Sequence, residues 1–280
     1  MASSSSSAAP TDPSVAVLIR VDQSGHGDYK KIQDAIDAVP SNNTEFVYIW
    51  VKPGNYSEKI VVPADKPYIT LSGKQAKDTI ITWADGDHIY DSPTVSVLAS
   101  NFNTYGARGK GVALRVAGDK AAFYGCRMIS YQDTLLDDVG RHYYKNCYIE
   151  GATDFICGNA ASLFEPKTEL LLPKGGRHRG RILVISSWDA KSPAKGLEQL
   201  TLEGHGEHIR GNVVYGEYKC YGPGSNRAMR VSWSKSLTNN EAAPFLSKDM
   251  IGGRAWIRPA PTKFKKGFSA HSMKHHSNRN

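Results

Sequence analysis

The sequence predicts an all-β fold in which short strands stack as a parallel β-solenoid, and two observations support this prediction. First, from Val15 onward the chain is a series of short runs rich in β-branched and aromatic residues, separated by Gly, Pro, Asp and Asn, which are strand and turn signals. Second, the sequence matches itself at an offset of 21 residues, a period typical of a solenoid built from strands and turns. The expected early strands are Val15–Val21, Phe46–Val51, Ile60–Val62, Tyr68–Leu71, Thr79–Trp83, Thr94–Leu98 and Val112–Val116.

Two short helices are expected among the strands. Over Tyr29–Val39 the apolar residues recur at i, i+3, i+4 and i+7, so they fall on one face of a helix that should cap one end of the core. These residues are Ile32, Ala35, Ile36 and Val39. A second helix is expected over Asn239–Leu246, with Asn239 or Asn240 near its N-cap and with its length limited by Pro244.

The composition indicates one sizeable domain with a basic surface. A chain of 280 residues with 40% apolar content is long enough to bury a core of its own. Its formal charge of +8 favours a polyanionic partner. Nucleic acid, anionic lipid and acidic polysaccharide would each satisfy that charge, which alone does not choose among them. No apolar stretch of about 18 residues is present, so we expect no membrane span.

Two tails flank the expected domain, which covers residues 15–262. Residues 1–14 are a low-complexity stretch without the basic residues and apolar core of a secretory signal peptide. Residues 263–280 are basic and His-rich and show no apolar periodicity. We therefore expect 263–280 to be a solvated, disordered tail, with a dedicated binding arm as the alternative.

The internal repeat brings two aspartates into the same register. Equivalent residues of neighbouring solenoid coils lie about 4.8 Å apart, the spacing between strands of a sheet. We therefore expect Asp133 and Asp154 to be neighbours on one face, whereas the alternative is that their spacing is a coincidence. The aligned segments are Ala121–Asp133 and His142–Asp154, with Phe123 on Tyr144, Gly125 on Asn146, Cys126 on Cys147, Met128 on Ile149 and Asp133 on Asp154.

The four cysteines lack the spacing of a metal or redox site. Cys126, Cys147, Cys157 and Cys220 contain no C-x-x-C pair, so we expect no metal site. The repeat stacks Cys126 on Cys147, and both stand in mid-strand among apolar residues. This favours an inward-facing pair of thiols over a disulfide.

The paired aspartates suit hydrolytic chemistry. Like-charge repulsion favours protonation of one carboxyl group while the other stays ionised, which separates an acid from a nucleophile or base. Ester and glycoside hydrolysis both use this division. Gln132 offers a neutral amide donor beside Asp133, as an oxyanion of acyl transfer requires, unless it is only a turn residue. Phe155 and Ile156 would line an apolar wall after Asp154 or pack in the core.

The residues around both aspartates resemble a known family. Tyr131–Leu135 (YQDTL) and Gly151–Ala160 (GATDFICGNA) are similar to the two signature blocks of plant pectinesterases, also called pectin methylesterases, which are right-handed parallel β-helix enzymes. Residues 15–100 resemble the opening of the family, including DYKKIQDAIDAV and VKPGNY, and residues 213–262 resemble its closing segment. The resemblance implies a single-stranded right-handed parallel β-helix with a short N-terminal capping helix.

The resemblance also implies a mechanism and a partner. Asp154 would attack the methyl-ester carbonyl, Asp133 would act first as acid and then as base, and Gln132 would donate to the oxyanion. Phe155 and Lys110 would contact the substrate. Methanol would leave first, and water would then free the galacturonate carboxylate. The implied substrate is methyl-esterified pectin in the cell wall, acted on by a monomer without cofactor, metal, nucleic acid or membrane.

Two departures from the family lie near the site. Residues that complete a strand in the family are missing between Phe102 and Asn103, so one coil is expected to be short. Successive side chains of a strand point to opposite faces of the sheet. A deletion that shifts the strand by one residue would therefore exchange the side chains that face the core with those that face outward. Lys110 stands where many members carry a glutamine that serves the oxyanion. It would act there as a flexible point charge, or else be a solvated surface lysine.

A third departure concerns the stretch 166–212. This stretch lacks alternation of period two and does not resemble the family. It also lacks the family's Leu-Gly-Arg-Pro-Trp block, whose arginine orients the nucleophilic aspartate. Without that arginine we expect reduced activity. The alternative functions are therefore a catalytically impaired, polyanion-binding β-helix protein and, ranked below it, another β-helix lyase or glycosidase.

Overall fold

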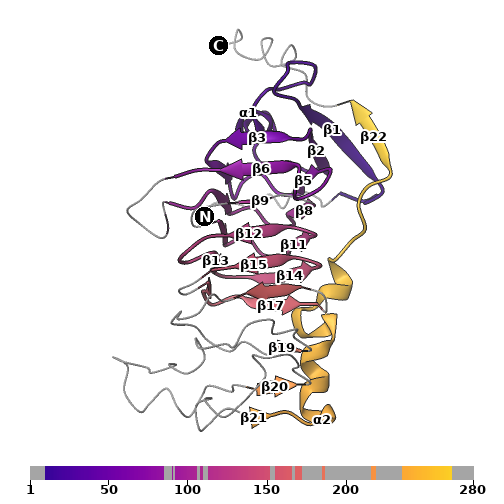
Figure 1. Cartoon of the computed structure of the whole chain (residues 1–280). Helices are drawn as coiled ribbons and strands as arrows, with labels where there is room; N and C mark the ends of the chain where they lie inside the picture. The colour runs from indigo at the N-terminus through magenta and orange to yellow at the C-terminus, as the bar shows by residue number, and fades with distance from the viewer. Residues whose placement is uncertain are drawn as a thin grey trace, which may run out of the picture.

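The computed structural model shows a column of stacked coils in which neighbouring strands run parallel (Figure 1). It describes residues 10–84, 90, 92–105, 108–109, 113–151, 155–165, 168–171, 185–186, 216–218 and 235–266. Every strand pairing given for these residues is parallel, and consecutive coils contribute neighbouring strands to three long sheets. The predicted parallel β-helix is therefore confirmed. No described helix is long and apolar enough to cross a membrane.

The largest sheet has eight strands in the order β17-β14-β11-β8-β5-β2-β1-β22. Its strands alternate between core-facing and outward-facing side chains, as a sheet covered on one side requires. Strand β1 coincides with the predicted run Val15–Val21. The bounds are β1 (Val15–Val21), β2 (Val47–Val51), β5 (Ile69–Gly73), β8 (Asn103–Tyr105), β11 (Ala121–Tyr124), β14 (Arg141–Lys145), β17 (Ala161–Phe164) and β22 (Lys263–Lys266).

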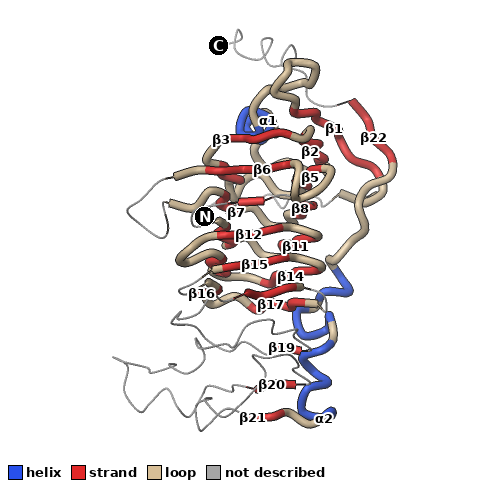
Figure 2. The backbone as a smooth tube through the Cα atoms, viewed as in Figure 1, coloured by secondary structure: helices blue, strands red, loops and turns tan. Residues whose placement is uncertain are grey.

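The other two long sheets complete the coils (Figure 2). The five-stranded sheet contains β4 (Ile60–Val62), β7 (Val95–Val97), β10 (Leu114–Val116), β13 (Leu135–Asp137) and β16 (Ile156–Cys157). The six-stranded sheet contains β3 (Gly54–Ser57), β6 (Thr79–Thr82), β9 (Arg108–Gly109), β12 (Arg127–Ile129), β15 (Tyr148–Glu150) and β18 (Glu169–Leu171). All seven predicted early strands are confirmed, with ends that differ by at most two residues.

The repeat of 21 residues is confirmed by the strand register. Phe123 pairs with Tyr144 in the eight-stranded sheet, and Met128 pairs with Ile149 in the six-stranded sheet. Inside the coils the aromatic rings stack: the Phe123 and Tyr144 centroids are 5.0 Å apart, and those of Tyr144 and Phe164 are 4.6 Å apart. Each such pair contributes roughly 0.5–1.5 kcal/mol beyond its area of burial.

The N-terminal helix α1 (Ile32–Asp37) lies at one end of the column and buries Ile32, Ala35 and Ile36, as predicted. It begins three residues later than expected because Tyr29 forms a bridge with Val21 of β1. The carboxylate of Glu58 accepts hydrogen bonds from the amides of Ile32 and Gln33, at 3.1 and 3.0 Å. A side chain from a later coil therefore satisfies the first amides of this helix.

The C-terminal segment packs on the outer face of the eight-stranded sheet over β11, β14 and β17 (Figure 1). It contains α2 (Asn239–Ala242) and the 3₁₀ helices η4 (Ala243–Leu246), η5 (Lys248–Ile251) and η6 (Gly253–Ala255). The N-cap of α2 is Thr238, one residue before the prediction, and forms a capping box with Glu241. Ile251 and Trp256 are buried against Ala122, Tyr143 and Leu163 on the outside of the sheet.

Strand β22 corrects the prediction that residues 263–280 form a disordered tail. Lys263–Lys266 pair in parallel with β1, from Val15↔Lys263 to Leu18↔Lys266. A Lys-rich run lacks the alternation that predicts a strand. An edge strand, however, can be exposed on both faces, and all four residues of β22 are exposed. Residues 267–280 lie outside the described part of the chain.

The atypical stretch 166–212 also contains strands, although its sequence lacks alternation of period two. Glu169–Leu171 form β18, which pairs with β15 at the regular offset, Tyr148 with Glu169. Further along, β19 (Ile185–Ser186) pairs with β20 (Gly216–Tyr218), and β20 pairs with β21 (Lys235–Ser236). The regular stacking therefore continues beyond residue 166. The remaining residues of the stretch lie outside those that the structure describes.

The predicted short coil is present, and its deficit falls later than the sequence suggests. Leu114 follows Arg108 by six residues, whereas their partners Leu135 and Arg127 are eight residues apart. The connection between β9 and β10 is thus shorter by two residues than the next one, which preserves the alternation of inward and outward side chains. The described connection around Phe102 and Asn103 has no deficit: β7 and β8 keep the same spacing as β10 and β11.

The core contains a defect at Thr104 on β8, in the same coil. Thr104 pairs with Leu71 on one side and Phe123 on the other, and so a small polar side chain occupies a position filled by large apolar ones in the neighbouring coils. A cavity of about 40 Å³ lies beside it, lined mainly by apolar residues that include Phe102, Leu114 and Met128. The hydroxyl of Thr104 is buried without a hydrogen-bond partner.

Candidate active site

Asp133 lies in the turn between β12 and β13, where the chain passes from the six-stranded to the five-stranded sheet. Its backbone has φ of +50°, in the left-handed region. Few residues other than glycine adopt this conformation, aspartate among them, and it recurs at functional sites. Along the turn Tyr131 is 78% exposed, Gln132 is exposed and Asp133 is half-buried. The turn therefore presents a phenol, an amide and a carboxyl group at or near the surface.

The side chain of Gln132 contacts that of Asp133. Gln132 Nε2 donates a hydrogen bond to Asp133 Oδ2 at 3.2 Å. The backbone of Gln132 is held in turn, because its carbonyl accepts a bond from the Ser130 hydroxyl at 3.1 Å. Two of the three predicted catalytic residues are thus adjacent in space, with the amide directed at the carboxylate.

The turn is anchored to the next coil. Thr134 Oγ1 donates to the carbonyl of Glu150 at 3.0 Å, and the amide of Leu135 donates to the carbonyl of Phe155 at 2.9 Å. Gly151 packs so tightly here that a Cβ would lie 2.3 Å from Thr134 Oγ1. Gly151 and Phe155, which flank residues 152–154, therefore both contact the residues that follow Asp133. Asp154 itself lies outside the described residues.

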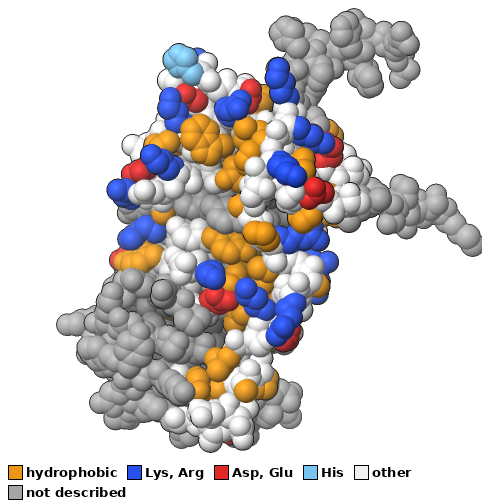
Figure 3. Space-filling model, turned by 90° about the vertical axis from the view of Figure 1, so that its right-hand side faces the viewer, with side chains coloured by type: hydrophobic (Ala, Val, Ile, Leu, Met, Phe, Trp, Pro, Cys, Tyr) orange, Lys and Arg blue, Asp and Glu red, His pale blue; other side chains and the backbone are white. Residues whose placement is uncertain are grey.

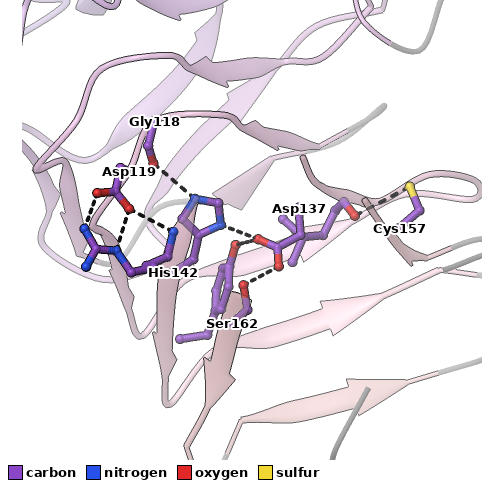
Figure 4. Close-up of polar contacts among 9 residues, drawn as sticks. Gly118, Asp119, Asp137, His142, Cys157 and Ser162 are labelled. Carbon is purple, nitrogen blue, oxygen red and sulfur yellow. Dashed lines mark hydrogen bonds and ion pairs between the residues drawn. The ribbon is translucent and has the colours of Figure 1, made fainter. Parts of the chain in front are cut away.

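The other end of β13 is held by a buried polar cluster that the sequence did not predict (Figure 4). Asp137 Oδ1 accepts a hydrogen bond from the Tyr144 hydroxyl at 2.7 Å and lies 2.6 Å from His142 Nδ1. Asp137 Oδ2 accepts a bond from the Ser162 hydroxyl. His142 Nε2 lies 3.1 Å from the carbonyl of Gly118. The cluster therefore ties β13 to β14 and β17.

Burial and the nearby carboxylate act together on Tyr144. Burial, and then the negative charge of Asp137, raise the pKa of Tyr144 well above its ordinary value. The phenol therefore stays protonated and acts as a donor to Asp137. Little in the sequence indicated this cluster. His142 and Ser162 pair in the strand register, but Asp137 contacts both of them only because the coils are stacked.

A cation also lies on the outer face of the five-stranded sheet, on β10 beside β13. Arg115 Nη2 is 3.0 Å from Asp138 Oδ2, and its guanidinium lies 4.9 Å from the centroid of the Tyr90 ring. Both partners of the ion pair are about one-fifth exposed, with 22% and 20% of their side chains accessible. The charge of Arg115 is thus already matched by Asp138.

The remaining predicted site residues have different outcomes. Phe155 is 2% exposed and belongs to the main hydrophobic core, so the predicted substrate contact is corrected in favour of core packing. Ile156 also packs against this core. Lys110 lies outside the described residues, as does Cys220.

The described cysteines, Cys126, Cys147 and Cys157, are thiols that form no disulfide. Cys126 and Cys147 are buried in neighbouring coils, which confirms the predicted inward-facing pair. Burial, reinforced by Cys126, raises the pKa of the Cys147 thiol well above its ordinary value. Cys157 is half-buried on β16. No group of three or more His, Cys, Asp or Glu side chains within the described ranges is arranged to hold a metal ion.

Comparison with known proteins relates most of the chain to one family. The pectinesterase family model matches residues 18–197, and so includes the first part of the stretch 166–212 that motifs alone did not relate to the family. Putative pectinesterase 11 of Arabidopsis thaliana is 48% identical over 302 residues, covering 91% of this chain and 84% of that protein. Probable pectinesterase 49 of the same plant is 35% identical, covering 87% and 81%.

Solved structures agree with this relationship. Pectin methylesterase from carrot superposes with a TM-score of 0.70 at 26% identity, covering 90% of this chain and 96% of that one. The enzyme from Aspergillus niger, at 24% identity, shares the fold with a TM-score of 0.69 over 89% and 97% of the two chains. With its parallel coils, its Gln132–Asp133 turn and its long match to these relatives, the chain belongs to the pectinesterase family.

Proposed function

We propose that this protein is a pectinesterase that hydrolyses the methyl esters of polygalacturonate to free carboxylate and methanol. The observation that carries the proposal is the contact between the Gln132 amide and the Asp133 carboxylate, in a turn anchored beside residues 152–154. An amide donor beside a carboxyl group suits acyl transfer, in which one group binds the oxyanion and the other moves a proton.

We assign the nucleophile to Asp154, and the strand register supports the assignment. Leu135 pairs with Ile156, and Asp133 and Asp154 each stand two residues before these partners in the sequence. The flanking residues Gly151 and Phe155 contact Thr134 and Leu135. A nucleophile at position 154 would therefore approach a substrate held at the Asp133 turn.

The reaction follows from these roles. The Asp154 carboxylate attacks the ester carbonyl carbon, and the oxyanion that forms accepts a hydrogen bond from the Gln132 amide. The protonated Asp133 gives its proton to the methoxy oxygen as the C–O bond breaks, and methanol leaves. The ionised Asp133 then takes a proton from water, which attacks the acyl group on Asp154. The galacturonic acid that forms releases one proton to solvent and leaves as a carboxylate, while Asp133 is again protonated and Asp154 again ionised.

The polymeric nature of the substrate rests on further support. Two pectin methylesterase structures that share this fold, at 21% identity, are complexes with hexasaccharides. The formal charge of +8 suits an anionic polymer. We infer methyl-esterified pectin as the partner and the plant cell wall as the place of action. A role for Lys110 in oxyanion binding stays a prediction.

Titration of the acid released from methyl-esterified pectin tests the proposal. We expect the purified protein to release acid and Asp133→Asn to lose at least 100-fold in rate, since loss of a general acid typically costs about 10²–10⁴-fold. Asp65→Asn, at an exposed turn between β4 and β5, is the matched control and should keep the wild-type rate. A wild-type protein that binds pectin without releasing acid would instead favour the non-catalytic alternative.

A further inference from the structure

The outer face of the eight-stranded sheet carries aromatic and basic side chains at its N-terminal end. On β1 the core-facing residues are Val17, Ile19 and Val21, and so Ala16, Leu18 and Arg20 face outward. The register places Tyr48 beside Leu18 and Trp50 beside Arg20. On the other side of β1 it places Phe264 beside Ala16 and Lys266 beside Leu18. We call this surface the aromatic–basic face; it consists of Arg20, Tyr48, Trp50, Phe264 and Lys266.

The aromatic side chains of this face are partly or largely exposed to solvent. Phe264 is 46% exposed, and its ring centroid lies 5.1 Å from that of Tyr48, with the planes tilted by 55°. Tyr48 and Trp50 are half-buried, and the Tyr48 hydroxyl donates to Ser72 Oγ at 2.8 Å, which fixes the ring. Figure 3 shows hydrophobic side chains at the surface of this side of the molecule, surrounded by lysines and arginines and by fewer aspartates and glutamates.

The charge of this face is one-sided. Arg20 and Lys266 are exposed, and the outward positions of β1, β2 and β22 carry no acidic residue. Two acids adjoin the face: Glu45 pairs with Lys265, and the exposed Asp28 accepts a hydrogen bond from the backbone amide of Arg20 at 2.7 Å. Beyond this pair, Arg258 lies over the Phe46 ring at 5.3 Å. On the three strands themselves, a negatively charged partner would therefore meet cations and no carboxylate.

Lysines on an edge strand have an ordinary explanation, because they discourage association with another sheet. That explanation does not account for the aromatic rings, since exposed apolar surface would promote the association that the lysines prevent. Exposed apolar groups rimmed by polar ones mark binding surfaces. Rings that offer a flat apolar face, together with cations at their edges, suit a sugar polymer that carries carboxylates.

We propose that the aromatic–basic face is a second polysaccharide site, which binds unesterified polygalacturonate, the product of the proposed reaction. The choice of polymer rests on the proposed function. The Asp133 turn lies between the six-stranded and five-stranded sheets, whereas this face belongs to the eight-stranded sheet, so the two sites lie on different sides of the column. Such a site would hold the protein on de-esterified stretches of the polymer while the Asp133 turn acts on methyl esters elsewhere.

Affinity of the full chain for unesterified polygalacturonate, measured by isothermal titration at several salt concentrations, tests the proposal. We expect the double variant Arg20→Glu/Lys266→Glu to bind at least tenfold more weakly and with a shallower dependence on salt. Lys77→Glu, an exposed lysine in the turn between β5 and β6, controls for net charge and should change affinity less than twofold. Trp50→Ala should weaken binding at least threefold, whereas Trp83→Ala, near the end of β6, should not.

Two further measurements separate the possible outcomes. Lys266→Glu alone, at the open edge of the sheet, changes folding least and should still weaken binding at least threefold. Turnover of a short methyl-esterified oligogalacturonide reports the proposed function and should be unchanged in all these variants. If the double variant binds as tightly as Lys77→Glu, the second site is ruled out. If the wild type binds but does not turn over the ester, the proposed function fails while the second site stands.

Discussion

Gly151 lies so close to Thr134 that a Cβ on Gly151 would sit 2.3 Å from Thr134 Oγ1 and 2.6 Å from the Cβ of Phe155. The glycine precedes the segment that contains Asp154, and the threonine follows Asp133. This contact therefore joins the two turns on which the proposed chemistry depends.

Replacement of this glycine should be costly. We expect Gly151→Ala to destabilise the protein by roughly 2 kcal/mol, because the added methyl group meets backbone-anchored neighbours that cannot withdraw. Urea unfolding measures the change. Gly125→Asn is the contrast: Gly125 has φ of +60° with open space at its Cβ, and its repeat partner Asn146 adopts φ of +54°. Gly125→Asn should stay within about 0.5 kcal/mol of wild type, and equal effects of the two variants would refute the steric argument.

The defect at Thr104 should be correctable. Thr104→Val removes a buried hydroxyl that has no partner and should stabilise the protein by about 1 kcal/mol in urea unfolding. Thr104→Leu should add about as much again by filling part of the cavity of about 40 Å³. The same Thr→Val change at Thr134, whose hydroxyl donates to Glu150, should have the opposite sign. Destabilisation by Thr104→Val would contradict the conclusion that the Thr104 hydroxyl is buried without a hydrogen-bond partner.

The buried polar cluster around Asp137 should contribute substantially to the free energy of unfolding. We expect Tyr144→Phe to cost roughly 2 kcal/mol in thermal or urea unfolding, because the carboxylate loses a buried donor while the ring keeps its stacking partners. Tyr48→Phe removes a hydroxyl bonded to Ser72 at a more open site and should cost less than about 1 kcal/mol. If the two changes cost the same, Asp137 does not depend on Tyr144.

The ion pair between Asp119 and Arg141 should make the stability of the protein depend on pH in the acid range. Hydrogen bonds from Arg141 hold the pKa of Asp119 below its usual value. A lowered pKa in the folded state stabilises the protein above the ordinary carboxyl pKa, and this contribution is lost as pH falls through the lowered value. Both side chains are about 40% exposed, at 41% and 39%, so Asp119→Asn should cost less than about 1 kcal/mol at pH 7.

Unfolding free energies from pH 7 down to pH 2 test this linkage. The difference between wild type and Asp119→Asn should shrink toward the acid end. A difference that is constant across this range would show that the pair does not titrate as the geometry requires.

The sequence predicted the fold well where local pattern and long-range packing agree. The strands of the early coils are runs of β-branched residues whose alternation matches their burial, and the offset of 21 residues became the register of β11, β12 and β13 with the next coil. The turn at Asp133 was predictable because turn residues and chemistry coincide there.

The failures have a common physical cause, which is that contacts between coils are not local in sequence. Glu58 caps a helix 25 and 26 residues earlier, and Ser162 reaches Asp137 across 25 residues. Phe155 follows a proposed catalytic residue, but its position in the stack places it in the core. Strand β22 forms because the edge of β1 offers partners, not because its lysines favour extended structure.

The central claim is that a carboxylate at position 154 performs nucleophilic catalysis on a methyl ester. The most direct measurement follows methanol and acid released from methyl-esterified pectin by wild type and by Asp154→Asn, with both proteins shown to be folded by circular dichroism. We predict equal amounts of methanol and acid from the wild type, and a loss of at least 1,000-fold in both for Asp154→Asn. Turnover by Asp154→Asn at the wild-type rate, or a folded wild type that releases neither product, would contradict the claim.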